Sequence, residues 1–401
     1  MLISLRVGEA LKIKVRPEDF VVSEALDIAL TENGQHRVYI LHKRGWNTVD
    51  AVGAVARASG VPVSQVRYAG LKDRHALTSQ YVTVSRQYVL TDKVPGISPE
   101  DLRLEQVGFS EDFVSTHNLR GNSFEVTLRG LSPEEAESIR SRIPEVKRAG
   151  FPNYFDDQRF GSVPPSGDLL AERILKGHLK GALRLYLTAE YPGLTAAEKA
   201  RRQAMSGAWG DWAAVQRQCQ SGVEKRIVET LQRGGNKKNL LDAVNAIPSH
   251  EMTMYFAAFQ ASIWNRVLCA LVGPAIGATL SVPGKAGDYL FPRDAASGLL
   301  EKIQSAEIPT VARRILPCEP DVQAAVASSI AERGLTASDL NLRGIRSAYL
   351  KSFYRRAVVV PDGLVAGEIV RDDLYRGRSK LVIRFSLPKG SYATMLLKAL
   401  A

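Results

Sequence analysis

The order of secondary-structure signals along the chain predicts an α+β protein in which a mainly helical domain interrupts a strand-rich one. Residues 1–130 show mostly strand patterns, residues 167–350 are rich in helix-forming side chains, and strand patterns return beyond Arg355. The length of 401 residues exceeds the usual size of a single domain. We therefore expect one discontinuous domain formed by residues 1–150 and 351–401, with residues 151–350 inserted into it.

Individual elements follow from hydrophobic alternation and from capping residues. Segments that alternate or are rich in β-branched and aromatic residues predict strands over 11–16, 20–26, 37–41, 80–86, 123–129, 357–360 and 381–385. Asn47 and Thr48 can cap a helix that ends near Gly60. Capping boxes at 132–135 and 195–198 predict the starts of two more helices, the first of them running from 133 to about 143.

The charge balance favours a polyanionic partner. The formal net charge is +11, and RNA, DNA and anionic membranes all attract such a surplus, although charge kept for solubility would look the same. One stretch mixes cations for phosphates with aromatic platforms for bases. It contains Arg343, Arg346, Lys351, Arg355 and Arg356 together with Tyr349, Phe353 and Tyr354. The charged face of an amphipathic helix is an equally good interpretation of this stretch.

Cysteine and histidine usage argues against metal sites and disulfide frameworks. The three cysteines, Cys219, Cys269 and Cys318, are far apart, and the six histidines show no HExxH spacing. The N-terminus carries early charges and lacks the apolar core of a signal peptide. The long uncharged run between residues 266 and 285 contains prolines and glycines, so we expect a buried helix end followed by a loop. A reducing cytoplasm, with no membrane segment, fits these features.

The densest polar cluster in the strand-rich region is residues 68–80. Gly70 allows a tight turn, and Asp73 lies between the cations Lys72 and Arg74, which favour its ionised form. An ionised carboxylate in a basic setting can act as a nucleophile or a base toward an anionic substrate. A hairpin loop with solvated charges is the competing interpretation of the same residues.

Six segments, in order, resemble the motifs of the TruD family of tRNA pseudouridine synthases. They are DFVVSE at 19–24, GLKDRHALTSQ at 70–80, LRGNSF at 119–124, NYFDDQRFG at 153–161, FQASIWN at 259–265 and FSLPKGSYAT at 385–394. The resemblance extends nearly from end to end of the chain. It implies a pseudouridine synthase catalytic domain with a mixed, mostly antiparallel sheet, plus an inserted, mainly helical TruD-type domain.

The resemblance also implies roles for particular residues. Asp73 corresponds to the catalytic aspartate, and Lys14, expected on an alternating strand, corresponds to its basic partner. The residues that correspond to the uridine pocket are Phe20, Asn122, Phe124 and Phe385. Aromatic faces can replace the stacking that a base loses when it leaves an RNA helix, and an amide can bind a uracil edge. Without the resemblance, the phenylalanines would be taken as core residues and Lys14 as a surface lysine.

The implied reaction is the isomerisation of a uridine in tRNA, at position 13, to pseudouridine. It is redox-neutral, so no cofactor is expected, and the sequence shows neither a GxxxxGK nor a GxGxxG phosphate loop. The expected partner is tRNA, with no metal and no obligate protein partner. A non-catalytic RNA-binding protein and a cofactor-dependent RNA methyltransferase are the alternatives. The first would lack Asp73 or the aromatic residues, and the second would need a glycine-rich cofactor loop.

One position departs from the family pattern. Asp156 stands where the TruD motif has glycine, and aspartate tolerates a positive φ better than most residues do. The pair Asp156-Asp157 could suggest a metal site, but no further ligands are recognisable near it in the sequence. We expect a solvated turn at this pair.

Overall fold

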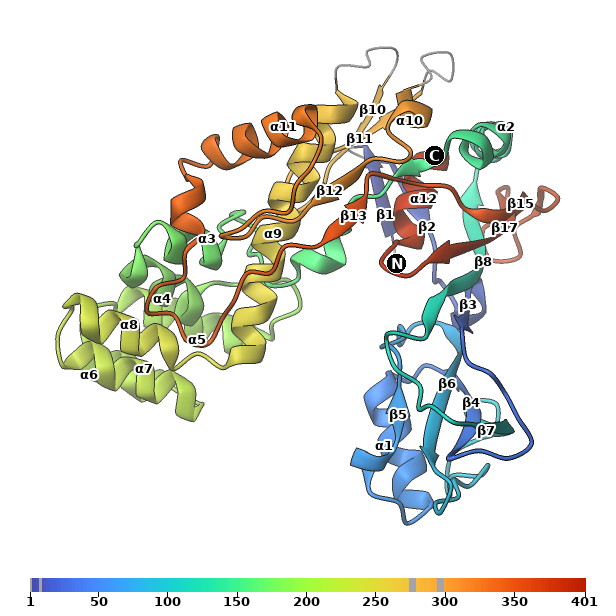
Figure 1. The fold of residues 1–401 in the computed structure, drawn as a ribbon, viewed down its shortest axis with the longest axis horizontal. Coiled ribbons are helices and arrows are strands. Elements are labelled where there is room, and N and C mark those ends of the chain that lie inside the picture. Colours follow the sequence, from blue (N-terminus) through green and yellow to red (C-terminus); the bar gives the residue numbers. More distant parts are fainter. Residues whose placement is uncertain (1, 7–8, 274–278, 294–298) are drawn as a thin grey trace. The chain divides into compact units, whose positions relative to one another are not determined.

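The computed structural model describes residues 2–6, 9–273, 279–293 and 299–401, which form two compact units. Unit 1 comprises the described parts of Met1–Phe151 and Val359–Ala401, and unit 2 comprises those of Pro152–Val358. The chain thus enters unit 2 once and returns once to unit 1 (Figure 1). The short strands β9 (Phe151–Pro152) and β14 (Val358–Val359) contain the two points at which the chain passes from one unit to the other.

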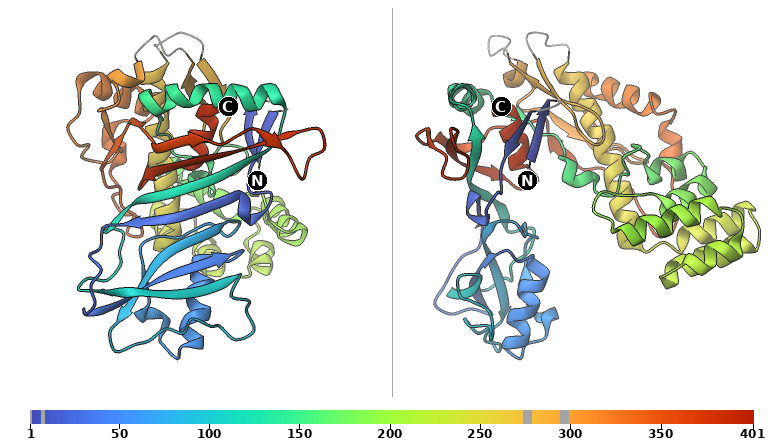
Figure 2. Two further views of the ribbon diagram at one scale, coloured as in Figure 1. Left: turned by 90° about the vertical axis from the view of Figure 1, so that its right-hand side faces the viewer. Right: turned by 180° about the vertical axis from the view of Figure 1, so that it is seen from behind.

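Unit 1 is built on a large mixed sheet, whose strands are seen side by side in Figure 2. Its path runs β1-β2-β8-β3-β6-β4-β7, while β17 pairs with β8, β15 and β16 pair with β17, and β5 pairs with β6. Only β3 and β6 run parallel among the described pairs, so the expected mixed, mostly antiparallel sheet is confirmed. The strands are β1 (Leu2–Arg6), β2 (Glu9–Lys12), β3 (Phe20–Leu26), β4 (His36–Arg44), β5 (Arg67–Tyr68), β6 (Leu77–Ser85), β7 (Leu102–Ser110), β8 (Leu119–Leu131), β15 (Asp362–Ala366), β16 (Val370–Arg371) and β17 (Ser379–Pro388).

Three α-helices complete unit 1. Helix α1 (Thr48–Ala58) begins at the Asn47 cap, as predicted, and packs its apolar residues on β4, β6 and β7. Helix α2 (Pro133–Ala149) begins at the predicted capping box but continues beyond residue 143 in spite of Pro144. Ile143, Val146 and Ala149 are buried, so apolar packing outweighs the lost hydrogen bond. Helix α12 (Ala393–Leu400) packs against α2 and β1.

The predicted strand over residues 11–16 is wrong in its second half. Strand β2 ends at Lys12, and Lys14 has a φ of 55°, which interrupts any strand. A short 3-10 helix, η1 (Pro17–Asp19), follows, and the Asp19 carboxylate accepts a hydrogen bond from the amide of Arg16 at 2.8 Å. A turn fixed by side chains therefore replaces the expected alternation.

Unit 2 is mainly helical, and α9 (Ser249–Val272) is its central helix, packed against α3, α11, β11 and β12 (Figure 1). The capping box at Thr195 begins α5, as predicted. The uncharged run after residue 266 forms the buried end of α9, as predicted, and further along it contains strand β10; residues 274–278, where the loop was expected, lie outside the described residues. The other elements are α3 (Leu170–Leu175), α4 (Leu179–Thr188), α5 (Ala196–Gly207), α6 (Trp212–Gln218), α7 (Gly222–Gln232), α8 (Lys237–Asn245), α10 (Leu299–Lys302), α11 (Pro320–Ala331), β10 (Thr279–Val282), β11 (Tyr289–Pro292), β12 (Glu307–Pro309) and β13 (Tyr354–Arg356).

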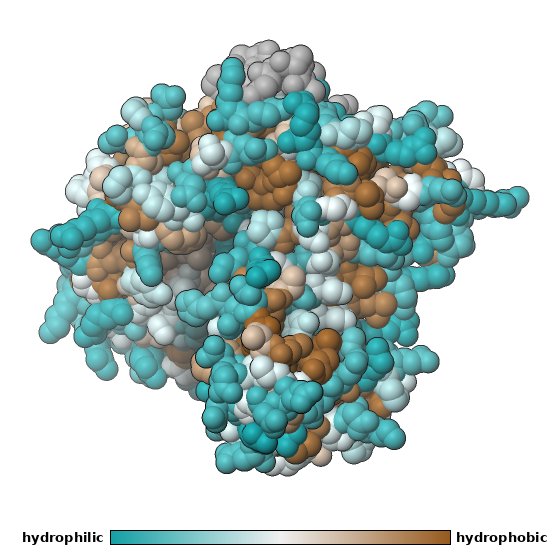
Figure 3. Space-filling model, turned by 45° about the vertical axis from the view of Figure 1, so that its right-hand side comes forward, coloured by the Kyte–Doolittle hydropathy of each residue, from teal (hydrophilic) through white to brown (hydrophobic). Residues whose placement is uncertain are grey.

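The surface is mostly hydrophilic, with hydrophobic patches between the polar side chains on the face shown in Figure 3. Leu71, Tyr349 and Phe353 are among the large hydrophobic residues that remain exposed. No helix in the described part of the chain is long and apolar enough to span a bilayer.

Candidate functional site

A row of side chains in register crosses five neighbouring strands of unit 1. Lys43 on β4 lies opposite Thr78 on β6, Thr78 opposite Val22 on β3, Val22 opposite Phe124 on β8, and Phe124 opposite Phe385 on β17. Residues directly opposite each other point to the same face of a sheet. The row therefore brings together two phenylalanines from distant parts of the sequence.

Residues two positions along the strands share that face. Phe20 and Glu24 flank Val22 on β3, and Asn122 lies opposite both Glu24 and Leu387. The Phe124 ring stacks on that of Phe385, with centroids 5.2 Å apart and an interplanar angle of 23°. Phe20 meets Phe124 edge-on at a centroid distance of 6.0 Å. The predicted pocket residues Phe20, Asn122, Phe124 and Phe385 thus lie on one face of three adjacent strands.

The loop between β5 and β6 carries Asp73, and the same face of the sheet holds it in place. Gln80 donates from Nε2 to the carbonyl of Gly70 at 3.1 Å, while the Lys72 amide donates to the hydroxyl of Thr48 at 2.9 Å. The Lys72 ammonium pairs with Glu24 at 2.5 Å, and both side chains are buried. The loop does belong to a hairpin, as the competing interpretation supposed, but its charges are not simply solvated.

Lys43 holds the backbone of this loop in place through hydrogen bonds to its carbonyl groups. Its buried ammonium donates to the carbonyls of Trp46 at 2.6 Å, Asp73 at 2.8 Å and Lys72 at 3.4 Å. Burial lowers the pKa of Lys43 to about 8, because the Asp73 charge offsets desolvation only in part and Lys72 adds to the lowering. Sequence patterns gave no sign of this role, since a lysine in a strand is normally solvated.

Asp73 is held ionised by its neighbours. Its Oδ2 accepts from the Lys14 ammonium, and its Oδ1 accepts from the His75 amide at 2.9 Å. Burial alone would raise the pKa of Asp73, but the hydrogen bond and charge of Lys14, with those of His75, hold it below its usual value. The side chain remains 31% exposed, so a substrate can reach the carboxylate.

Lys14 connects the carboxylate to the aromatic residues. Its side chain is 3% exposed, and its ammonium lies 4.2 Å from the centroid of the Phe20 ring while it pairs with Asp73. The structure thus places Asp73, Lys14, Phe20, Phe124 and Phe385 in one continuous chain of contacts. Lys14 reaches this position from a left-handed turn and not from the strand that the sequence predicted.

Two polar atoms on this face have no hydrogen-bond partner among the described residues. They are Oδ1 of Asn122 and Oγ1 of Thr78, and both are buried. Buried acceptors and hydroxyls normally find a partner, so these two unpaired atoms are distinctive on this face of the sheet. The unpaired amide oxygen agrees with the predicted role of Asn122, and Thr78, a member of the 70–80 motif to which the sequence assigned no role, shares this feature.

Comparison with known proteins identifies the family. The family model of tRNA pseudouridine synthase D (TruD) matches residues 2–400. The chain belongs to the TruD family. A tRNA pseudouridine synthase D of Leptospira interrogans is 31% identical over 400 residues, covering 97% of this chain and 95% of that protein. One of Aquifex aeolicus is 29% identical over 393 residues, covering 97% and 98% respectively.

The fold agrees with this family assignment. A crystal structure of the TruD homologue from Methanosarcina mazei superposes with a TM-score of 0.75 at 24% identity, covering 100% of this chain and 94% of that one. At that identity the likeness concerns the fold alone. The resemblance inferred from the six TruD motifs and the α+β fold class are both confirmed.

The position that departs from the TruD motif does not need a glycine. Asp156 has a φ of −77°, and it is buried, so the expected solvated turn is wrong there. Its neighbour Asp157 accepts hydrogen bonds from the Lys285 amide and the Tyr289 hydroxyl, both at 2.8 Å. Asp157 therefore connects two segments within unit 2. Within the described ranges, no group of His, Cys, Asp or Glu side chains is placed to hold a metal ion.

The basic and aromatic stretch of unit 2 is not an amphipathic helix. Residues 341–353 are irregular, with Gly344 at a φ of 85°, and Tyr354–Arg356 form strand β13. Arg355 is buried, donates to the Asn153 carbonyl at 2.6 Å and lies over the Phe155 ring, so it is structural. The exposed members of the stretch are Arg343, Arg346, Tyr349, Lys351, Phe353, Tyr354 and Arg356.

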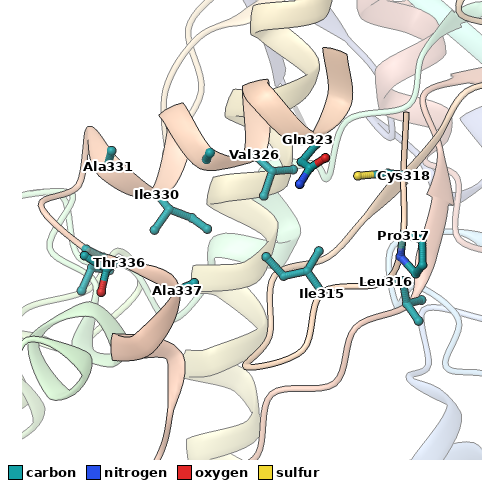
Figure 4. A pocket seen from close by; sticks show the side chains of 12 residues that line it. Ile315, Leu316, Pro317, Cys318, Gln323, Val326, Ile330, Ala331, Thr336 and Ala337 are labelled. Atoms are coloured by element: carbon teal, nitrogen blue, oxygen red, sulfur yellow. The ribbon is translucent and has the colours of Figure 1, made fainter. Parts of the chain in front are cut away.

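Unit 2 also contains a cavity of about 590 Å³, between α11 and two neighbouring segments, 315–318 and 335–337. Figure 4 shows Val326 and Ile330 of α11 on the side facing Ile315, with the Cys318 thiol nearby. Burial, helped by the charge of Glu319, raises the pKa of Cys318, so its thiol is not activated as a nucleophile. The mostly apolar lining offers no acid–base chemistry.

Proposed function

We propose that this protein converts a uridine of tRNA to pseudouridine and that Asp73 is its catalytic carboxylate. The observation that carries the proposal is the ionised, partly exposed Asp73 carboxylate, paired with Lys14 beside the stacked rings of Phe124 and Phe385. Membership of the TruD family and the names of its relatives support the reaction and the substrate class.

The reaction exchanges one glycosidic bond for another. The bond from C1′ of ribose to N1 of uracil breaks, and a bond from C1′ to C5 forms. The hydrogen on C5 leaves as a proton, and N1 gains one, so electrons balance without an oxidant. Asp73 can either attack the sugar covalently or take a proton from it, and both roles require the ionised form that Lys14 maintains.

The pocket residues act on the base. A uridine in a tRNA helix must leave its stack to reach a carboxylate, and aromatic faces compensate for the stacking that it loses. Phe124 is the central ring of the cluster, in contact with both Phe20 and Phe385, so it is the best placed to stack on the uracil. The unpaired Oδ1 of Asn122 can accept a hydrogen bond from a uracil N–H.

We assign recognition of the rest of the tRNA to the basic surface of the protein. The net charge of +11 and the exposed cations and aromatics between residues 343 and 356 support phosphate and base contacts there. By its family, the target is the uridine at position 13 of tRNA. A cytoplasmic location follows from a tRNA substrate and belongs to the same proposal.

The test is to map pseudouridine in a tRNA pool before and after incubation with the purified protein. Isomerisation leaves the mass of the RNA unchanged, so pseudouridine is read as a carbodiimide adduct in fragment mass spectra. We expect new pseudouridine at position 13. Pseudouridine only at other positions would correct the target, and a mass gain of one CH2, the net change on methylation, would support the methyltransferase alternative. Unchanged RNA would contradict the proposal.

A further inference from the structure

The backbone is strained at Lys14, the residue whose side chain pairs with Asp73. Lys14 has a φ of 55°, and in the described residues no other residue except glycine has a positive φ. A side chain in this conformation is unfavourable and persists only when the surrounding structure imposes it. Contacts on both sides of Lys14 are therefore needed to keep this segment in its strained conformation.

Arg129 on β8 contacts both ends of that segment. On the N-terminal side, its backbone lies opposite Lys12 in the pairing of β2 with β8. On the C-terminal side, its Nε donates to Oδ1 of Asp19 at 2.8 Å. Asp19 in turn closes the turn, because its Oδ2 accepts from the Arg16 amide at 2.8 Å.

The guanidinium of Arg129 is itself fixed by residues from the end of the chain. Its Nη1 donates to Asp372 at 3.0 Å and to Asp373 at 2.8 Å, and Asp372 also accepts from the amide of Gly130. The side chains of Arg129, Asp19 and Asp372 are all buried. The planar fork of arginine presents its donors to the three carboxylates in fixed directions, a geometry that the compact ammonium of lysine does not reproduce.

We propose that Arg129 is a positioning residue of the reaction: it fixes the turn at Lys14 from both ends and so keeps the Lys14 ammonium on Asp73. Arg129 acts through Lys14 and makes no contact with the substrate. The inference rests on the proposed catalytic role of Asp73. It goes beyond that role because it assigns a function to the ionic cluster formed by Asp19 of η1, Arg129 of β8 and residues 372–373.

The test is a double-mutant cycle between Arg129→Lys and Lys14→Met, measured as single-turnover rates across pH. Arg129→Lys alone should lower the rate by on the order of 10-fold to 100-fold, as misplacement of a catalytic group does, with KM for tRNA little changed. The acid limb of its pH profile should move to higher pH, because a poorly held Lys14 no longer depresses the pKa of Asp73. In the Lys14→Met background, Arg129→Lys should cause no further loss.

A matched control comes from another arginine ion pair that involves β8. Arg384 on β17 pairs with Glu125 on β8 at 2.6 Å at the surface, so Arg384→Lys should change neither the rate nor the pH profile. Additive losses in the double mutant, or a normal rate and acid limb in folded Arg129→Lys, would overturn the proposal. If Arg129→Lys does not fold, Asp19→Asn tests the contact between Arg129 and Asp19 from the other side. The amide oxygen of the new side chain can still accept from the Arg16 amide, so the turn keeps that hydrogen bond. The rate, the acid limb and the additivity with Lys14→Met then decide in the same way. Failure of the proposed function is recognised separately, by an active Asp73→Asn.

Discussion

Replacing Lys14 by methionine tests how the site keeps its carboxylate ionised. The substitution preserves the length and apolar stem of the side chain and its contact with Phe20, but removes the ammonium that pairs with Asp73. An adjacent cation lowers the pKa of a carboxyl group, and the Lys14 ammonium does so for Asp73 although the Asp73 side chain is 31% exposed. Burial remains in the variant and continues to raise the pKa.

The sign of the pH effect follows directly. In the parent, the pKa of Asp73 is depressed, so the carboxylate is ionised above the ordinary value of about 3.9 and is lost only below it. In Lys14→Met, protonation of Asp73 should begin at higher pH, and the acid limb of activity should move to higher pH. The pairing also stabilises the fold above the ordinary carboxyl pKa, and this contribution disappears as pH falls through the depressed value.

The assay is single-turnover release of tritium from C5 of labelled uridine in tRNA, from below the ordinary pKa of an aspartate side chain up to neutral pH. Lys12→Met is the matched control, because the Lys12 ammonium lies 3.9 Å from the centroid of the Tyr375 ring and not on Asp73. Lys12→Met should keep the acid limb of the parent. An unchanged acid limb in folded Lys14→Met would refute the argument that Lys14 sets the ionisation of Asp73.

Two further variants separate base recognition from tRNA binding. Phe124→Ala removes the central ring of the aromatic cluster, and the lost stacking, worth roughly 1–3 kcal/mol per base, should appear in the single-turnover rate while tRNA affinity changes little. An equal loss of affinity would show that the ring binds RNA before the base is extruded. Arg346→Ala removes a cation whose side chain is 79% exposed, so affinity should fall and the logarithmic salt slope should shrink by about one unit, with the saturated rate intact. Unchanged binding across a salt series would place the tRNA elsewhere.

The parts of the site that lie on regular strands could be predicted from the sequence. The strand predicted over 20–26 is observed with those bounds, and alternation already places Phe20, Val22 and Glu24 on one face. What the sequence cannot supply is register. Phe124 and Phe385 meet because β8 and β17 pair with one particular offset, and that offset is decided by packing across the whole sheet.

The errors arose where distant side chains determine local structure. Lys14 looked like part of an alternating strand, but the ion pairs of Arg129 with Asp19 and Asp372 impose a turn. Arg355 was expected to be an exposed cation. Its guanidinium is instead buried in unit 2, where it donates hydrogen bonds to the backbone carbonyl of Asn153. Lys43 passed unnoticed because its three acceptors are backbone carbonyls, which leave no signature in the sequence.

The central claim is tested most directly by Asp73→Asn, measured for pseudouridine formation and for tRNA binding in the same preparation. Asparagine keeps the size and the acceptor for the His75 amide but cannot carry the negative charge that Lys14 stabilises. We expect no detectable turnover, with tRNA affinity within about 1.4 kcal/mol, or tenfold, of the parent. Pseudouridine formation by Asp73→Asn, shown by mass spectrometry to be free of deamidated protein, would contradict the account.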